Sequence, residues 1–359
     1  MVKYKDIGII FLLVVYSVLV IVWCKDISEY VLTSIKLCIN VIVPSLYIFM
    51  IISDFFITSN VYVLFGRPFS LFSRYVFRIP EQYFSIFLIS SIGGYPVGAK
   101  LLSDLSRSNI IDIQSYKDML PYCYLSGPAF ICSIVGVNIF SDIKIGVLIF
   151  ISIFISNLII AAVIGRKRKI PNKNVYKLNL NLSIDGFIKS ISNGGKSILN
   201  ICVIIIFFSS IICIIDKLGI VSVVAHFIDK LSCLSYSNSM AVIKSSIEIS
   251  NISLFDGDKS LIPLISALLS FGGLCVIIQI KVFTNRFSIK NFVFFRIISM
   301  LLSYFICKII CVVIYNDYLM SNSPAYLAHG QNSPIQTAFL LIMTILFLLK
   351  FSIEKSRKI

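Results

Sequence analysis

Two adjacent glycines and a proline interrupt an apolar stretch of this chain that is long enough to form most of a membrane helix. Gly93, Gly94 and Pro96 lie within residues 82–99, a run that contains no Asp, Glu, Lys or Arg. Glycine loses the most backbone entropy in a helix and proline lacks an N–H, so an unbroken helix through them is unfavourable. We therefore predict two half-helices, the second beginning at Pro96, where a missing N–H costs nothing. Within a membrane, such a break is tolerated only where it faces protein or a water-filled cavity.

The composition is that of a polytopic integral membrane protein. Hydrophobic residues make up 58% of the chain and charged residues only 14%. The net charge of +15 comes from basic residues concentrated in a few loops, which the positive-inside rule explains without a nucleic-acid partner. The sequence contains no glycine-rich phosphate loop, zinc-ligand spacing or nucleophile elbow. We therefore expect neither an enzyme nor a bound metal or cofactor.

The basic loops also predict how the chain crosses the bilayer. Placing them all in the cytoplasm allows only one of the runs 82–99 and 119–141 to cross, and making 82–99 re-entrant keeps Lys100 inside with its basic neighbours. The result is an all-α protein of about eight transmembrane helices with both termini cytoplasmic. The uncharged or nearly uncharged runs are 7–23, 31–57, 82–99, 119–141, 145–164, 197–215, 261–280, 297–316 and 335–349.

The second half of the chain repeats this order with the opposite orientation. The run 197–215 is predicted to cross outward and 261–280 to return, so 240–254, which is short and polar, becomes a second re-entrant segment. An inverted repeat with two broken segments is the plan of many secondary transporters, which bind substrate near the midplane. The predicted divisions are an N-terminal helix (1–30), a first repeat with a following helix (31–164), a basic cytoplasmic loop (165–196), a second inverted repeat (197–290) and C-terminal helices with a basic tail (291–359).

The first repeat offers a site for an anion. Pro128, after Ser126 and Gly127, can open a half-helix to about residue 140, as Pro96 does in the preceding segment. Each helix N-terminus carries about half a positive charge and free N–H groups, which favour a carboxylate, and Lys100 would add a full charge. The alternative is that both breaks only kink helices for packing and that Lys100 reaches the membrane interface.

The second repeat contributes one acidic residue. Glu248 is the one acidic residue of the segment 240–254, where a carboxylate marks a transport pathway, a coupling site or a ligand for hydroxyl groups. The alternative is a buried partner for Lys244 or Lys100. Gly272, Gly273 and Gln279 indicate a further break with a polar lining, or only close packing. Asp54 and Lys36, near the ends of their helix, are expected at the interface.

These residues resemble a known family. The runs Gly94–Lys100, Ser126–Phe130 with Val135-Gly136, Glu248–Ser250 and Phe271–Val276 with Gln279 are similar, in the same order, to the sporulation integral membrane proteins called YlbJ or SpoVV. That group belongs to the nucleoside-recognition Gate families. The sequence departs from the pattern at Gly93, where serine is expected, at Tyr124-Leu125, where asparagine is usual, and at Asn251-Ile252, where glycine is expected.

The resemblance implies a carrier for dipicolinate, a pyridine with two carboxylates, in the outer forespore membrane of a spore-forming bacterium, moving it from mother cell to forespore. Two other functions stay open. A nucleoside-type carrier would expose Glu248 and amide side chains to a larger pocket, and a scaffold of the sporulation membrane would have no midplane cavity. The sequence specifies neither a coupling ion nor an oligomeric state. The candidate substrate-binding residues are Gly93, Gly94, Tyr95, Pro96, Gly98, Lys100, Ser126, Gly127, Pro128, Glu248, Ser250, Gly272, Gly273 and Gln279.

Overall fold

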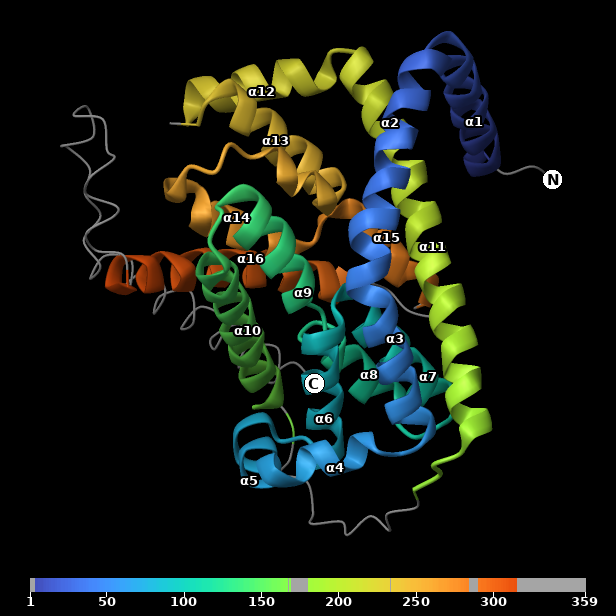
Figure 1. The fold of residues 1–359 in the computed structure, drawn as a ribbon, viewed down its shortest axis with the longest axis vertical. Helices are drawn as coiled ribbons and strands as arrows, with labels where there is room; N and C mark the ends of the chain where they lie inside the picture. Colours follow the sequence, from blue (N-terminus) through green and yellow to red (C-terminus); the bar gives the residue numbers. More distant parts are fainter. Residues whose placement is uncertain (1–3, 167, 169–179, 233, 284–289, 315–359) are drawn as a thin grey trace.

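The computed structural model describes residues 4–166, 168, 180–232, 234–283 and 290–314, and every regular element within them is a helix (Figure 1). Five helices in these ranges are long and apolar enough to cross a membrane, and two more are apolar but shorter. The all-helical membrane architecture is therefore confirmed, whereas the count of eight spans stays a prediction. The predicted span 335–349, the basic tail and both chain ends lie outside the described residues. The five long helices are Cys24–Thr58, Ile143–Gly165, Ile184–Lys217, Lys259–Lys281 and Lys290–Ile314.

The first half of the chain is built around one long helix. Its helices α2 and α3 are joined by a wider π-helical turn, Cys38–Ile42. After several short helices the half ends in another π-helical stretch, Ile131–Ile139, followed by α10. The elements are α1 (Tyr4–Val22), α2 (Cys24–Leu37), α3 (Val43–Thr58), α4 (Tyr62–Gly66), α5 (Ser70–Phe72), α6 (Glu81–Gly93), α7 (Tyr95–Arg107), α8 (Ile113–Met119), α9 (Pro128–Phe130) and α10 (Ile143–Gly165).

The second half begins with another long helix and ends in broken ones. The long helix packs beside α2 and α3 (Figure 1), and the polar turn Ile249–Leu254 separates the hairpin that follows it from the last helices. The elements are α11 (Ile184–Lys217), α12 (Ile220–Leu231), α13 (Tyr236–Ile247), α14 (Ile262–Phe271), α15 (Gly273–Phe283) and α16 (Lys290–Ile314).

Local capping residues set where several of these helices begin. The side chains of Asp142, Ser183 and Ser235 precede α10, α11 and α13 and each accepts a hydrogen bond from a backbone N–H in the first turn. Such a cap satisfies one of the donors that a helix start leaves free and is worth about 1 kcal/mol. The starts of these three helices therefore follow from the sequence.

The order long helix, broken segment, second broken segment occurs in both halves of the chain. In the first half it is α2–α3, then α6 and α7, then the interrupted stretch that ends in α9. In the second half it is α11, then α13 with its polar turn, then α14 and α15. The inverted orientation of the two repeats, and the superposition of 31–141 on 197–281 about an axis in the membrane plane, stay predictions.

Three loops predicted to share one side of the membrane meet at one end of the molecule, beside α4 and α5 (Figure 1). The guanidinium of Arg78 donates to the backbone carbonyls of Arg166 and Arg168, each at 3.1 Å. Arg168 in turn pairs with Asp118 at 2.8 Å. These contacts support the grouping of the basic loops, while their assignment to the cytoplasm stays a prediction. Helix α12 lies at the opposite end.

A seam of serine hydroxyls joins α16 to α10 and α14. Ser299 lies within 3.0 Å of the Ser156 hydroxyl and within 2.7 Å of the Ser270 hydroxyl, and Ser266 and Ser303 are 2.7 Å apart. All five side chains are fully buried. Small polar residues let membrane helices approach closely and hydrogen bond across the contact. The seam fixes α16 across α10 in Figure 1.

Candidate functional site

The helix breaks at Gly94 and Gly127 are present, as predicted. Gly94 has φ +86°, between the end of α6 and the start of α7, and Gly127 has extended backbone (ψ 146°) immediately before α9. The two glycine backbones touch, because a Cβ placed on Gly94 would lie 3.2 Å from the Gly127 nitrogen. The second interruption is longer than predicted, since α8 ends at Met119 and no regular helix covers residues 120–127. The predicted broken segment across 119–141 therefore has its break where expected, before Pro128, but the break begins earlier in the chain.

Replacing Gly94 by alanine is expected to lower stability by about 2 kcal/mol, because a side chain at positive φ is strained and its Cβ would press on Gly127. The measurement is the melting temperature of the purified protein in detergent. Gly195→Ala is the matched control, because nothing lies within 4 Å of its added Cβ. That change, inside a helix, should raise stability slightly. Equal melting temperatures for Gly94→Ala and the unchanged protein would contradict the strained break.

Two further breaks lie in the second half. Glu248 has extended backbone (φ −138°, ψ 115°) between α13 and the following turn. Gly272 has φ +85° and Gly273 φ +78° between α14 and α15. A Cβ on Gly272 would collide with the Tyr124 hydroxyl, and one on Gly273 would lie 3.1 Å from the Ser245 carbonyl oxygen. These glycines therefore shape the site by close backbone packing, which was one of the two predicted roles.

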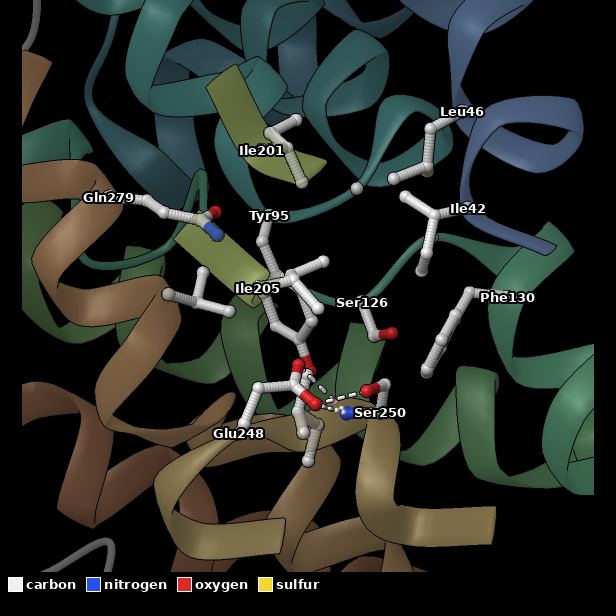
Figure 2. A pocket seen from close by; sticks show the side chains of 14 residues that line it. Ile42, Leu46, Tyr95, Ser126, Phe130, Ile201, Ile205, Glu248, Ser250 and Gln279 are labelled. Carbon is white, nitrogen blue, oxygen red and sulfur yellow. Dashed lines mark hydrogen bonds between the residues drawn. The ribbon is translucent and has the colours of Figure 1, made fainter. Parts of the chain in front are cut away.

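The breaks converge on a central pocket of about 40 Å³, room for roughly three water molecules (Figure 2). Its walls come from both halves of the chain and include Ser126, which is fully buried. Seven of the fourteen candidate residues line it; the others shape the breaks behind it or lie further away. The lining residues are Ile42, Leu46, Gly94, Tyr95, Ser126, Gly127, Phe130, Ile201, Ile205, Glu248, Ile249, Ser250, Val276 and Gln279.

Glu248 reaches this pocket without a basic partner among the described residues. Its carboxylate accepts hydrogen bonds from the Ser250 backbone N–H at 3.1 Å, from the Ser250 hydroxyl and from the Asn251 amide at 3.2 Å. Lys244 pairs instead with Asp216 at 2.7 Å, so it does not neutralise Glu248. The carboxylate is thus held by neutral donors at the start of a helical turn, a position that favours negative charge.

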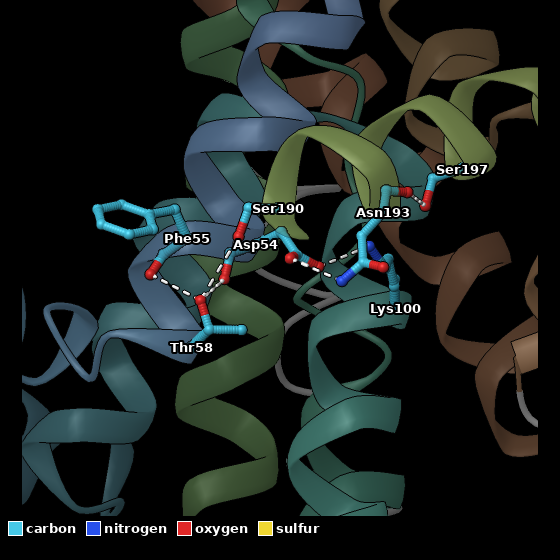
Figure 3. A network of polar contacts seen from close by, with 7 residues as sticks. All are labelled: Asp54, Phe55, Thr58, Lys100, Ser190, Asn193 and Ser197. Carbon is cyan, nitrogen blue, oxygen red and sulfur yellow. Dashed lines mark hydrogen bonds and ion pairs between the residues drawn. The ribbon is translucent and has the colours of Figure 1, made fainter. Parts of the chain in front are cut away.

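Lys100 does not reach the central pocket, contrary to expectation. Its ammonium lies 2.8 Å from a carboxylate oxygen of Asp54, whose other oxygen accepts from the Asn193 amide at 3.1 Å (Figure 3). Asp54 was expected at the membrane interface, but its residue is only 6% exposed. The same contact excludes a Lys100 pair with Glu248. Tertiary packing of α3 against α7 and α11 decides this pairing, and the spacing of residues along the chain gives no sign of it.

Arg296 is a central residue that the sequence prediction missed. It is fully buried, and its guanidinium donates to the Tyr124 carbonyl at 2.6 Å, the Ser270 carbonyl at 3.3 Å and the Asn157 side-chain oxygen at 2.6 Å. It also lies over the Tyr124 ring at 4.9 Å. Helix ends carry unpaired carbonyls and partial negative charge, which a cation satisfies. A signal was available, since Arg296 is a lone charge beside a long apolar run.

Two tyrosines connect the breaks to one another. The Tyr95 hydroxyl donates to the Leu269 carbonyl, and the Tyr124 hydroxyl donates to the Phe271 carbonyl at 3.1 Å. Both carbonyls belong to the last turn of α14, just before Gly272. The first half of the chain therefore caps the broken helix of the second half.

A larger cavity lies on the other side of Glu248. This vestibule has a volume of about 340 Å³ and shares Glu248 and Ser250 with the central pocket. Its size is within the range of small-molecule sites, roughly 300–1,000 Å³. No group of three His, Cys, Asp or Glu side chains suited to a metal occurs in the described part of the chain. The vestibule is lined by Glu29, Tyr30, Thr33, Ser34, Leu37, Ser209, Ile212, Lys244, Glu248, Ser250, Asn251, Ser253 and Leu254.

Comparison with known proteins gives one curated match. The chain is 27% identical over 140 residues to the sporulation integral membrane protein YlbJ of Bacillus subtilis (strain 168). The match covers 38% of this chain and about a third (34%) of that protein's length. No family model and no solved structure matches. Together with the apolar helices, the match identifies the chain as an integral membrane protein similar to a sporulation membrane protein.

Proposed function

We propose that the protein is a carrier that moves a small polar metabolite across the membrane. The observation that supports this most is the central pocket, which lies where broken segments from both halves of the chain meet and which contains a buried carboxylate. Broken helices around a central pocket are the usual construction of a secondary transporter site. A scaffold would need no such pocket, so this arrangement weighs against the purely structural role.

Dipicolinate is the substrate to test first. The sporulation resemblance favours it, and the backbone breaks at Gly94 and Gly127 direct helix N-termini towards the pocket. In that case the protein would work in the outer forespore membrane. Because Glu248 lines the same pocket, we expect a dianion to be accompanied by a proton or another cation that compensates the carboxylate.

A nucleoside is the second candidate, and the lining residues favour it. Glu248 and the Gln279 amide line the central pocket, whereas Lys100 does not. Carboxylate and amide groups suit the hydroxyls and base edges of an uncharged ligand better than they suit a dianion. The central pocket in this conformation is too small for either compound, so either would have to enter from the vestibule or after a conformational change.

Uptake into proteoliposomes by the purified full-length protein tests the proposal, with labelled dipicolinate and uridine measured side by side. A carrier should take up one of them faster than empty liposomes do and should show saturation. Unlabelled compound added in excess should compete. Failure of both compounds to enter, with correctly inserted and folded protein, would contradict the proposed function for these substrates.

A further inference from the structure

The contact between Asp54, Lys100 and Asn193 has the chemistry of a carboxylate-binding seat (Figure 3). A primary ammonium and a side-chain amide converge on the two oxygens of one carboxylate, at 2.8 and 3.1 Å. The Lys100 side chain keeps 16% of its surface exposed and Asp54 keeps 7%. The seat is therefore largely closed to water, and within it a charged hydrogen bond is stronger than it is at the surface.

The seat lies on the same three helices that form walls of the central pocket. Along α3, Asp54 comes two turns after Leu46, about 12 Å further along the helix. Along α7, Lys100 follows Tyr95 by about 7.5 Å.

On α11 the seat residue comes before the pocket residue in the chain. Asn193 precedes the pocket residue Ile201 by two turns, again about 12 Å. The three helices therefore converge on the seat beyond the pocket, towards the end of the molecule that carries α4 and α5 (Figure 1). The vestibule opens off the other side of the pocket, at Glu248.

We propose that Asp54 occupies, in this conformation, the seat that a carboxylate group of the substrate takes during transport. While Asp54 holds Lys100, α3 and α7 are joined at this end. A small carboxylate that reaches Lys100 and Asn193 competes with Asp54, replaces its two hydrogen bonds and separates α7 from α3. The inference rests on the proposed carrier function and specifies its substrate class as small carboxylates.

Other charges near the seat do not remove this competition. Asp104, one turn after Lys100 on α7, interacts electrostatically with Lys100 and Asp54, and Arg107 interacts with Asp104. Arg107 offsets the charge of Asp104, so Asp54 is the carboxylate that balances the charge of Lys100. Removing the Asp54 charge should therefore favour an incoming carboxylate.

The test compares two substitutions, one on each side of the ion pair. If the ion pair were only structural, both would change dipicolinate binding in the same way. Dipicolinate binding to the purified protein in detergent is measured by isothermal titration for the unchanged protein, Asp54→Asn and Lys100→Gln. If Asp54 is an internal competitor, Asp54→Asn should bind dipicolinate roughly tenfold more tightly, a change of about 1.4 kcal/mol. Lys100→Gln should bind it at least tenfold more weakly, since the ammonium itself is lost.

Two controls accompany the titration. The uncharged diamide of dipicolinate should bind all three proteins alike, because it does not compete for the ammonium. Asp118→Asn removes an ion pair with Arg168 outside the pocket walls and should leave dipicolinate affinity unchanged. Elution as a single species on size exclusion confirms that each variant is folded.

Opposite shifts for Asp54→Asn and Lys100→Gln would support the seat. Weakening by both, or no change in either, would overturn it, as would failure of dipicolinate to bind any of the three proteins. Uptake is measured separately, so the two proposals can fail independently. Tighter binding by Asp54→Asn without any uptake would retain the seat and reject the carrier. Uptake by the unchanged protein, together with weakened dipicolinate binding in both variants, would retain the carrier and reject the seat.

Discussion

Replacement of Arg296 by methionine should give one of the largest losses of stability available from a single change in this chain. Methionine has a similar length but no donors, so the Tyr124 carbonyl, the Ser270 carbonyl and the Asn157 side-chain oxygen would lose their hydrogen bonds. A buried acceptor without a partner costs about 1–3 kcal/mol. Removing the buried charge offsets part of this, and we expect a net loss of about 3 kcal/mol, seen as a lower melting temperature in detergent.

Two further variants separate this role from a general effect of losing an arginine. Arg107→Met changes an exposed arginine at the end of α7 and should leave the melting temperature nearly unchanged. Arg296→Lys keeps the charge, but a lysine ammonium cannot reach three separate acceptors in one plane. Its melting temperature should therefore lie between those of the unchanged protein and Arg296→Met. A melting temperature for Arg296→Met equal to that of the unchanged protein would mean that the guanidinium does not hold the breaks together.

Replacement of Glu248 by glutamine should reduce transport at least tenfold while the protein remains folded. The carboxylate accepts from both the backbone N–H and the hydroxyl of Ser250, and a glutamine amide would place donors against one of them. Because Lys244 and Lys100 pair elsewhere, Glu248 is not required as a partner for either lysine. Loss of transport would therefore reflect the contacts of the carboxylate in the pocket, with Ser250, with the substrate or with a compensating cation.

Initial rates of uptake into proteoliposomes measure this effect. Glu29→Gln is the control, because Glu29 also lines the vestibule but is exposed and lies away from the central pocket. It should retain near-normal uptake. Normal uptake by Glu248→Gln would show that the charge of Glu248 has no part in transport, and the proposed pathway would then need another centre.

The helix breaks could be predicted because glycine and proline act locally. Gly94 and Gly127 interrupt the backbone wherever the rest of the chain lies, and the helices that follow these breaks begin within one residue of the predicted positions. Capping residues such as Ser183 work over the same short range. For the same reason Tyr95, Ser126 and Glu248, which lie at or beside breaks, were correctly placed near one another, and all three line the central pocket.

The partners of the charged residues could not be predicted, because they depend on which helices pack together. From its position one turn beyond Pro96, Lys100 could either bind a ligand or pair with Asp54. Only the packing of α3 against α7 decides between these two partners. Arg296 is similar. Its acceptors, Tyr124, Asn157 and Ser270, come from three separate parts of the chain, and no spacing in the sequence relates them to it.

The links between the breaks determine which parts of the molecule can move as units. Tyr95 and Tyr124 attach the first half of the chain to the end of α14, and Gly94 touches Gly127. These breaks should therefore travel together as one rigid block. Helices α3 and α11 pack on each other and form a second body, which meets the block across largely apolar side chains of the central pocket.

Apolar side chains slide past one another at little cost, since no hydrogen bond has to break. Two lysine–aspartate pairs cross this sliding surface, Lys100 with Asp54 towards the α4 end and Lys244 with Asp216 towards the α12 end. Each ion pair would limit the displacement of α3 and α11 relative to the block in one direction. Both pairs are formed in this structure, so a displacement in either direction would have to break one of them.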